Sequence, residues 1–348
     1  MASSITWQEL VSQPARWRQL GRRSPTPAEL WAEVRAAEQV VVFGSGSSYY
    51  LAALVGDTIE RMTGRRVLAT PSCEVMLDPD RLLPPIAGRR VAIGFSRSGE
   101  SSEVLLATAT MRERGIPVLG VTCAGASSLS RGASECLVVP EWHEDGMVML
   151  RSFTCMLLAC RMALGPGAMG VAEGDVSAAV GRLADAGEAL LQASEGPIGV
   201  LARARPFDRF VLLGSGADHP LAQEASLKLQ EMATVTTEPY YTLEYRHGPR
   251  STGDAQTLAT VFAPARVDLG VSLVRDLAAQ GLSTLVIGGD VSAYRTVATA
   301  VVSVGTALPA ALRQMLALLP VQLLAFATAA RTGQDPDAPR NLAKVVLF

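Results

Sequence analysis

Two serine-rich turns, each following a short apolar run, carry the clearest chemical signal in this sequence. The first turn follows residues 39–44 (QVVVFG), and the second follows residues 89–95 (RRVAIGF). Their serines are Ser47 and Ser48 in the first turn, and Ser96, Ser98 and Ser101 in the second. Short hydroxyl side chains and unpaired N–H groups at the start of a helix suit a phosphate group, and Arg97 would add a charge-assisted contact. The alternative, in which these serines only cap helices, stays open.

A charged face is expected on a helix over residues 220–233 (PLAQEASLKLQEMA). Glu224, Lys228 and Glu231 stand at positions i, i+4 and i+7, and this spacing places them on one face of the helix. A carboxylate held beside an ammonium group can act as a general base. The same spacing is also typical of a solvated salt-bridge stripe, so both interpretations remain.

Two more side chains are candidates for proton transfer or charge stabilisation. His247 lies in YRHGP (245–249), where Gly-Pro directly after the histidine predicts a rigid loop, and loops often carry functional residues. Lys344 stands four residues from the end of the sequence, after a Pro- and Asp-rich stretch. A purely structural histidine and a solubilising lysine are the alternatives.

The elements that must position these side chains follow an α/β pattern. The apolar runs at 39–44 and 89–95 predict strands, and 104–115 (VLLATATMRERG) predicts a helix that Gly115 ends. Residues 117–122 (PVLGVT) predict the next strand. Strands that alternate with helices at this spacing indicate a parallel sheet with helices on both faces.

The pattern occurs twice along the chain. RFVLLGSG (209–216) repeats the first strand and turn, with Gly214 at 214 − 44 = 170 residues after Gly44. The sequence therefore predicts two tandem doubly wound parallel-sheet domains, at 28–165 and 195–330. They are accompanied by an N-terminal helical segment (1–27), a helical connector (166–194) and a C-terminal tail (331–348). The second copy has PARVD (264–268) in place of the second serine turn, so we expect one ligand site per chain.

Composition and charge exclude several classes of function. Lys+Arg 31 against Asp+Glu 33 leaves a net charge of −2, whereas a nucleic-acid partner calls for a basic face. Neither serine turn is a Walker A or G-x-G-x-x-G motif, which disfavours nucleotides. Five scattered cysteines and three histidines predict neither a disulfide framework nor a metal site. The apolar run 315–330 is shorter than the ~20 residues of a membrane span, so we expect a buried core helix in a cytoplasmic protein.

Taken together, the motifs resemble the tandem sugar isomerase (SIS) domain proteins. The resemblance rests on GSGSSYY, FSRSGESSE, RSFTCMLLA, EASLKLQEMA, EYRHGP and PRNLAK, and it covers nearly the whole chain. The family includes the isomerase half of glucosamine-6-phosphate synthase and the sugar-phosphate deaminase/isomerases of amino-sugar catabolism. FSRSGES, RSFT-x-MLLA and RHGPRS are closer to the deaminase/isomerase branch (tagatose-6-phosphate ketose/aldose isomerase-like), since the synthase has Gln where Arg97 stands.

The resemblance implies roles for the candidate residues. The first serine turn contacts the ligand and the second holds the phosphate group. Glu231 moves a proton between C1 and C2 of the sugar, and Lys228 is its neighbouring lysine. His247 assists ring opening at the site of a neighbouring subunit, which implies a homodimer. Lys344 lies close to C1 and C2.

The implied reaction converts an amino-sugar 6-phosphate to a ketose 6-phosphate and ammonia through an enolamine, without a metal or organic cofactor. A substrate with a hydroxyl at C2 would be isomerised by the same steps. A non-catalytic sugar-phosphate-binding regulatory protein and a fructosamine-type deglycase are the alternatives. No glutaminase or helix-turn-helix domain is expected before the first copy. Residues 144–151 (EDGMVMLR) depart from the synthase pattern, so Met147 and Met149 leave the sugar open.

Overall fold

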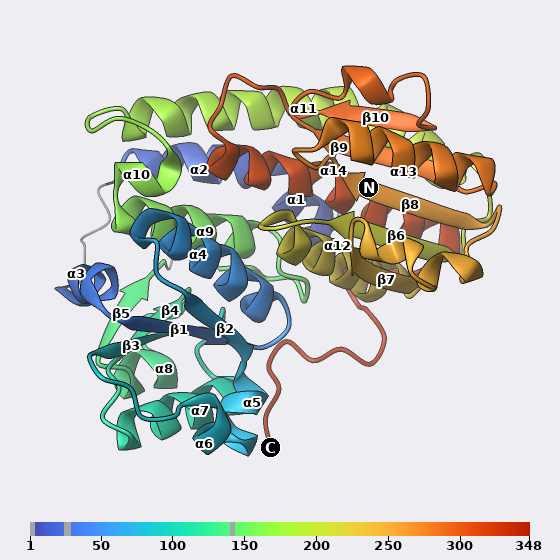
Figure 1. The fold of residues 1–348 in the computed structure, drawn as a ribbon. Coiled ribbons are helices and arrows are strands. Elements are labelled where there is room, and N and C mark those ends of the chain that lie inside the picture. Colours follow the sequence, from blue (N-terminus) through green and yellow to red (C-terminus); the bar gives the residue numbers. More distant parts are fainter. Residues whose placement is uncertain (1–3, 24–28, 140–142) are drawn as a thin grey trace. The chain divides into compact units, whose positions relative to one another are not determined.

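A computed structural model describes residues 4–23, 29–139 and 143–348 (Figure 1). The chain divides into two compact units. The N-terminal sheet unit consists of residues 15–181 and 343–348, and the C-terminal sheet unit consists of residues 1–14 and 182–342. The boundaries fall within helices α2 (Gln13–Gly21) and α11 (Val176–Ala204). The predicted boundary at 27/28 lies outside the described residues.

The N-terminal sheet unit contains a five-stranded parallel sheet in the order β2-β1-β3-β4-β5. The strands are β1 (Gln39–Gly44), β2 (Val67–Pro71), β3 (Arg90–Phe95), β4 (Val118–Thr122) and β5 (Glu135–Val138). The helices are α3 (Glu29–Ala36), α4 (Ser47–Thr63), α5 (Ser72–Leu77), α6 (Pro79–Leu82), α7 (Ser102–Glu113), α8 (Ser128–Gly132), α9 (Arg151–Leu164) and α10 (Pro166–Met169). The strands predicted at 39–44, 89–95 and 117–122 and the helix ending before Gly115 are confirmed.

Helices cover both faces of this sheet, with α4 and α9 on one side and α7 and α8 on the other (Figure 1). Side chains of a strand point alternately to the two faces. Val41 and Phe43 of β1 therefore pack in a core with Met111 of α7, whereas Val42 faces Gly56 of α4. Because both faces are covered, β1 and β3 are apolar without a break, as buried parallel strands usually are.

The C-terminal sheet unit repeats this topology. Its parallel sheet has the order β10-β9-β8-β6-β7. If these strands are numbered 1 to 5 along the chain and the sheet is read from the β7 edge, the order is 2-1-3-4-5, as in the first sheet. The strands are β6 (Arg209–Gly214), β7 (Thr236–Tyr241), β8 (Thr257–Phe262), β9 (Ser283–Gly288) and β10 (Ala300–Ser303). The other elements are α1 (Ile5–Val11), α12 (Asp218–Ala233), η2 (Glu244–Arg246), η3 (Pro249–Thr252), α13 (Val267–Ala279), η4 (Ser292–Tyr294) and α14 (Ala310–Thr332). The prediction of two doubly wound α/β domains is confirmed.

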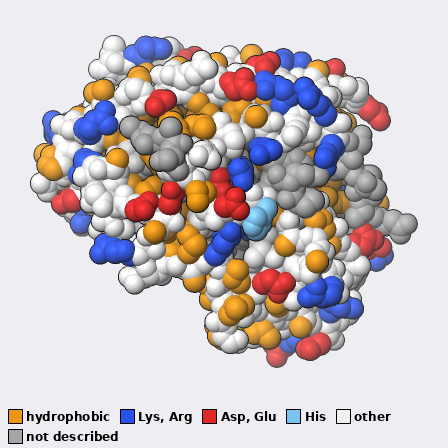
Figure 2. All heavy atoms as spheres, turned by 180° about the vertical axis from the view of Figure 1, so that it is seen from behind, with side chains coloured by type: hydrophobic (Ala, Val, Ile, Leu, Met, Phe, Trp, Pro, Cys, Tyr) orange, Lys and Arg blue, Asp and Glu red, His pale blue; other side chains and the backbone are white. Residues whose placement is uncertain are grey.

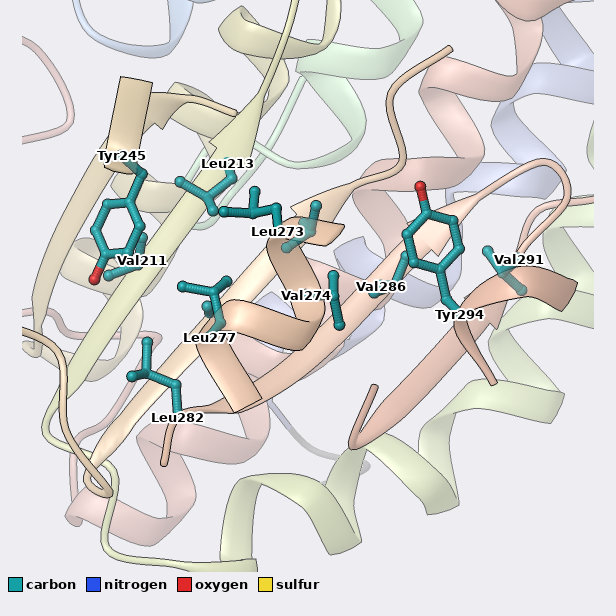
Figure 3. Packing of buried hydrophobic residues seen from close by; sticks show 12 residues of the cluster. Val211, Leu213, Tyr245, Leu273, Val274, Leu277, Leu282, Val286, Val291 and Tyr294 are labelled. Atoms are coloured by element: carbon teal, nitrogen blue, oxygen red, sulfur yellow. The ribbon is translucent and has the colours of Figure 1, made fainter. Parts of the chain in front are cut away.

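One core cluster of this unit lies between β6, β8 and β9 and helix α13 (Figure 3). Leu273, Val274 and Leu277 of α13 pack there against Val211 and Leu213 of β6. The cluster also contains two fully buried tyrosines, Tyr245 and Tyr294, which come from the segments after β7 and β9. These rings anchor both segments to the sheet, because a buried aromatic side chain contributes a large apolar area.

Helix α14 is long and apolar enough to cross a membrane, but 72% of its apolar window is buried inside the structure. It packs along α12 within the C-terminal sheet unit. The run at 315–330 is therefore a core helix, as predicted. On the face of the molecule that Figure 2 shows, acidic and basic side chains are interspersed, in line with the small net charge.

The two chain ends pack in different units. Ser4 and α1 belong to the C-terminal sheet unit, where the Asp337 carboxylate accepts hydrogen bonds from Thr6 N (2.8 Å) and Ser4 Oγ (2.9 Å). Trp7 of α1 stacks at a tilt on Phe326 of α14, with ring centroids 5.0 Å apart. Residues 343–348 pack in the N-terminal sheet unit instead. The end of the chain is thus part of the unit that holds the serine turns.

The buried thiol of Cys123 makes the free energy of unfolding depend on pH. Cys123 is 3% exposed, and burial, aided by the charge of Glu144, raises its pKa to about 12 from an ordinary value of 9.0. As the pH rises above 9, the unfolded chain loses this proton while the folded chain keeps it, so stability falls. In urea titrations between pH 8 and pH 10.5, C123A should therefore show a pH slope shallower by up to about 1.4 kcal/mol per pH unit. Identical slopes for the two proteins would contradict this prediction.

Candidate active site

Both serine turns leave the same edge of the N-terminal sheet. Strands β1 and β3 are parallel neighbours, and Phe43 of β1 is paired with Gly94 of β3. Their carboxyl ends therefore lie side by side, and each is followed by a turn and a helix, α4 or α7. In open α/β sheets this edge is where ligands bind.

The first turn is tight and buries its hydroxyl groups. A Cβ at Gly44 would come within 2.5 Å of the Ser48 backbone, so only glycine lets the strand end approach the helix this closely. Ser47 and Ser48 begin α4 and are each 5% exposed. The Ser48 hydroxyl lies 3.9 Å from Met149 Sδ, a weak acceptor. The residue that the sequence singled out at 149 thus contacts this turn.

The second turn uses its serines to fix its own backbone. Ser96 Oγ accepts from Gly99 N at 3.0 Å, and Ser98 Oγ accepts from Glu100 N at 3.1 Å. Ser101 is the N-cap residue of α7, with no side-chain hydrogen bond to the helix. A serine hydroxyl that accepts one hydrogen bond still has its proton to donate. The turn is thus preformed and retains donors for an anion.

Gly99 is required by the path of this turn. Its φ is +68°, which favours glycine, and a Cβ there would lie 2.1 Å from Ser127 Oγ. Its carbonyl also accepts from Leu129 N at 2.9 Å. The turn is therefore held against the start of α8.

Arg97 makes protein contacts that the sequence did not predict. Its guanidinium group is nearly buried and lies 3.3 Å from the carboxylate of Glu144, which is fully buried. It also donates to the carbonyl of Met147 at 3.0 Å. The contact to phosphate that we predicted for Arg97 stays a prediction.

Lys344 lies beside the second serine turn within the same unit. Its ammonium group donates to the carbonyls of Glu144 (2.6 Å) and Asp145 (3.2 Å). Two residues further on, the carbonyl of Val346 accepts from Ser102 N, the first N–H of α7, at 3.1 Å. The tail is thus ordered against the start of α7, which a solubilising tail would not be.

The charged face of α12 is buried in the C-terminal sheet unit. Glu224 and Lys228 are fully buried, and the Glu231 side chain is 14% exposed. Lys228 Nζ lies 3.3 Å from Glu224 Oε1 and 2.5 Å from Glu231 Oε2. The interpretation as a solvated salt-bridge stripe is therefore wrong, because these side chains are buried. The helix spacing alone could not show this, since it does not reveal what packs against the face. A buried lysine holds the Glu231 carboxylate in place.

His247 is exposed, although the residues before it are anchored. Tyr245 is fully buried in the core cluster of Figure 3, and Arg246 donates to Asp276 Oδ2 at 2.7 Å. The backbone N–H of His247 donates to the Glu244 carbonyl at 2.9 Å. The imidazole thus projects from a rigid 3-10 turn into solvent, where it is available to a ligand or another subunit.

In the second copy, a buried tyrosine packs against the start of the helix that follows the counterpart of the phosphate turn. At Gly270, in the first turns of α13, a Cβ would lie 2.2 Å from Tyr294 Oη and 2.9 Å from Pro264 Cγ. Tyr294 is fully buried there. One ligand site per chain stays a prediction.

The structure therefore groups the predicted residues by unit. The two serine turns, Arg97 and Lys344 lie in the N-terminal sheet unit, and Lys228, Glu231 and His247 lie in the C-terminal sheet unit. Sequence reasoning missed Glu144 and Ser152, whose side chains hydrogen bond to each other. A carboxylate shortly before an apolar stretch, with serine near the start of that stretch, is a helix-capping signal that could have identified them.

Substituting Gly99 tests the geometry of the second turn against simple backbone strain. Gly115 has a similar φ of +72° but nothing within 4 Å of a built Cβ, so G115A reports the strain alone, about 1–2 kcal/mol. G99A should cost clearly more in urea unfolding, because Ser127 must also move. Equal losses of unfolding free energy in G99A and G115A would show that the close approach of Ser127 to Gly99 adds nothing to the cost.

Removing the Lys228 charge should be severe, because two carboxylates would lose their buried counter-ion. We expect K228M to lose about 3–5 kcal/mol of unfolding free energy at pH 7. Adding E224Q to K228M should recover part of the loss, since it removes one of the uncompensated charges. Unfolding of K228M at the wild-type urea midpoint would contradict the ion-pair assignment.

Comparison with known proteins identifies the family of this chain. The family model of the SIS domain matches residues 33–165. A protein of Streptomyces coelicolor, provisionally named D-galactosamine-6-phosphate deaminase AgaS, is 33% identical over 276 residues, or 74% of this chain and 69% of that protein. The glutamine–fructose-6-phosphate aminotransferase of Gloeobacter violaceus is 29% identical over 334 residues, or 92% of this chain and 53% of the enzyme. The chain thus spans about half the length of that aminotransferase.

Among solved structures, a glucosamine-6-phosphate deaminase from Thermotoga maritima aligns with a TM-score of 0.81 and 28% identity. The alignment covers 99% of this chain and 100% of that one. The sequence comparison and the structure comparison therefore point to the same kind of protein. The chain belongs to the SIS-domain family of sugar-phosphate isomerases and deaminases.

Proposed function

We propose that this protein converts an amino-sugar 6-phosphate to the ketose 6-phosphate and ammonia. Two of the similar proteins carry the name of a hexosamine-6-phosphate deaminase. The chain also has the residues that the family resemblance assigns to this chemistry. These two facts together support the proposed substrate class and reaction.

The observation that carries the proposal is the position of the two lysines in the chain. Of its 31 basic residues only two are lysines, Lys228 and Lys344, and the other 29 are arginines. A lysine ammonium is a compact point charge, whereas arginine is a planar fork, so the two are not interchangeable at a precise site. Lysine thus occurs only beside Glu231 and beside the second serine turn, the two places that the proposed chemistry requires.

Phosphate binding is assigned to the second serine turn. The hydroxyls of Ser96, Ser98 and Ser101 and the start of α7 present donors at one place. A helix N-terminus favours an anion through its free N–H groups and its dipole. Holding the non-reacting phosphate group fixes the sugar, so that binding energy orients the reacting carbons. Ser47 and Ser48 are assigned to the sugar side of the ligand.

Proton transfer is assigned to the C-terminal sheet unit. His247 opens the pyranose ring by moving a proton from O1 to O5, which leaves a C1 aldehyde. Glu231 then removes the proton from C2 and returns it to C1, through an enolamine. The resulting C2 imine reacts with water to give the ketose and ammonia. The 2.5 Å contact to Lys228 keeps the Glu231 carboxylate oriented for this step.

The remaining assignments concern charge and assembly. Lys344 supplies a positive charge near C1 and C2, where negative charge develops in the enolamine step. We assign His247 to the site of a second copy in a homodimer, because its imidazole is exposed on an otherwise anchored turn. A cytoplasmic location, no metal or organic cofactor and the domain limits given above complete the proposal.

The decisive experiment incubates the purified protein with glucosamine 6-phosphate or galactosamine 6-phosphate and measures ammonia and ketose 6-phosphate. We expect both products in equal amounts. E231Q should lower kcat by about 10²–10⁴-fold, the usual contribution of a general base, while the ligand still raises the melting temperature. The matched control is E195Q on α11, which is exposed and should keep the wild-type rate.

Other outcomes would replace the proposal. Isomerisation of a hexose 6-phosphate without ammonia release from any amino sugar would restrict the enzyme to aldose–ketose chemistry. A thermal shift with sugar phosphates but no product from any of them would indicate a regulatory sensor. Release of an amino acid from a fructosamine adduct would indicate a deglycase.

A further inference from the structure

Glu144 is a buried carboxylate outside the set of residues assigned above. It stands between β5 and α9 and is fully buried. Its Oε1 accepts from Leu150 N (2.7 Å) and Ser152 N (3.0 Å), and its Oε2 accepts from the Ser152 hydroxyl. Glu144 thus caps the start of α9, where the free N–H groups favour a negative charge.

The same carboxylate also pairs with the second serine turn. Arg97 Nη1 lies 3.3 Å from Glu144 Oε2, and both side chains are buried. The carbonyl of Arg97 in turn accepts from Thr122 Oγ1 (3.1 Å) and Cys123 N (3.0 Å), which ties the residue to the end of β4. Because a buried charge requires a partner, Arg97 and Glu144 fix each other.

The loop that follows Glu144 wraps around two cations. The carbonyls of Glu144 and Asp145 accept from Lys344 Nζ, and those of Gly146 and Met147 accept from Arg97 at 3.5 and 3.0 Å. Four consecutive carbonyls therefore point inward, two to each cation. The two cations thus hold this loop through its backbone carbonyls.

We propose that Glu144 is a positioning residue that holds Lys344 and Arg97 at the sugar-phosphate site. Full burial leaves its carboxylate no surface to offer a substrate, so it acts through the two cations. Its charge neutralises Arg97, its capping bonds fix the start of α9, and its own carbonyl receives the Lys344 ammonium group. The catalytic consequence rests on the function proposed above, whereas the structural coupling to Lys344 does not.

A substrate-free experiment tests the coupling directly. The chain has only two lysines, and Lys228 is fully buried, so acetylation of Lys344 by N-hydroxysuccinimidyl acetate can be followed by mass spectrometry. E144Q keeps the shape of the side chain but removes the charge that pairs with Arg97. We expect Lys344 in E144Q to be acetylated at least about tenfold faster than in the wild type, because the carbonyls that hold it open more often.

The matched control is T154V. Thr154 lies on the same helix α9, and its Oγ1 accepts from Trp17 Nε1 at 2.9 Å. T154V should lower the melting temperature but leave the acetylation rate of Lys344 below 25 °C unchanged. Equal acetylation rates for E144Q and the wild type, or equal acceleration in both variants, would overturn the proposal.

The kinetic test is a double-mutant cycle on the deamination rate. E144Q should lower kcat by about 10–100-fold in the wild-type background but by less than about threefold in K344A, because residues that act through one another are not additive. E144D, which keeps the charge, should recover part of the rate. Additive losses would overturn the role in positioning. A wild-type protein without activity would count against the proposed function alone, since the acetylation result stands independently of it.

Discussion

A carboxylate withdrawn from water needs donors around both of its oxygens, and this requirement organises the end of the N-terminal sheet. Glu144 meets it with the first N–H groups of α9, the Ser152 hydroxyl and the Arg97 guanidinium. Those partners come from a helix start and from the turn after β3, so satisfying one charge fixes two segments that are far apart in the sequence. The tail then adds Lys344 to carbonyls that this arrangement has already oriented. Order at this end of the sheet thus follows from charge compensation more than from apolar packing.

In the C-terminal sheet unit, buried charges are compensated within one helix, α12. Lys228 is buried between two carboxylates of α12, one turn before it and one turn after it. Removing a single partner from such a group leaves an uncompensated buried charge, which is costly. The three side chains therefore behave as a unit, and Glu231, the least buried of them, is the one presented to its surroundings. Such rigid support suits the general-base role proposed for Glu231.

Much of this fold could be predicted from the sequence. Other parts could not be predicted, and there are physical reasons for this. Strands β1, β3, β4, β6, β8 and β9 are continuous apolar runs because helices cover both of their faces. Strands β2, β5, β7 and β10 are the edge strands and are half-exposed, so their apolar runs are shorter or interrupted by polar residues. Helical spacing placed Glu224, Lys228 and Glu231 on one face, but only the structure shows that this face is buried. Arg97 was predicted to contact phosphate because nothing in its own motif points to a carboxylate 47 residues later.

The use of arginine and lysine links these observations. At most basic positions the chain has arginine, including the exposed ion pairs of Arg61 with Asp57 and Arg81 with Asp78, where either cation would serve. Arginine also stands opposite Glu144, where several donors must satisfy a carboxylate and three carbonyls at once, and a planar fork does this better than a point charge. Lysine is kept where one ammonium group reaches two acceptors on different residues, in α12 and in the tail. The choice between the two cations therefore follows local geometry at each buried site, and it separates the positions that hold the structure together from those assigned to the chemistry.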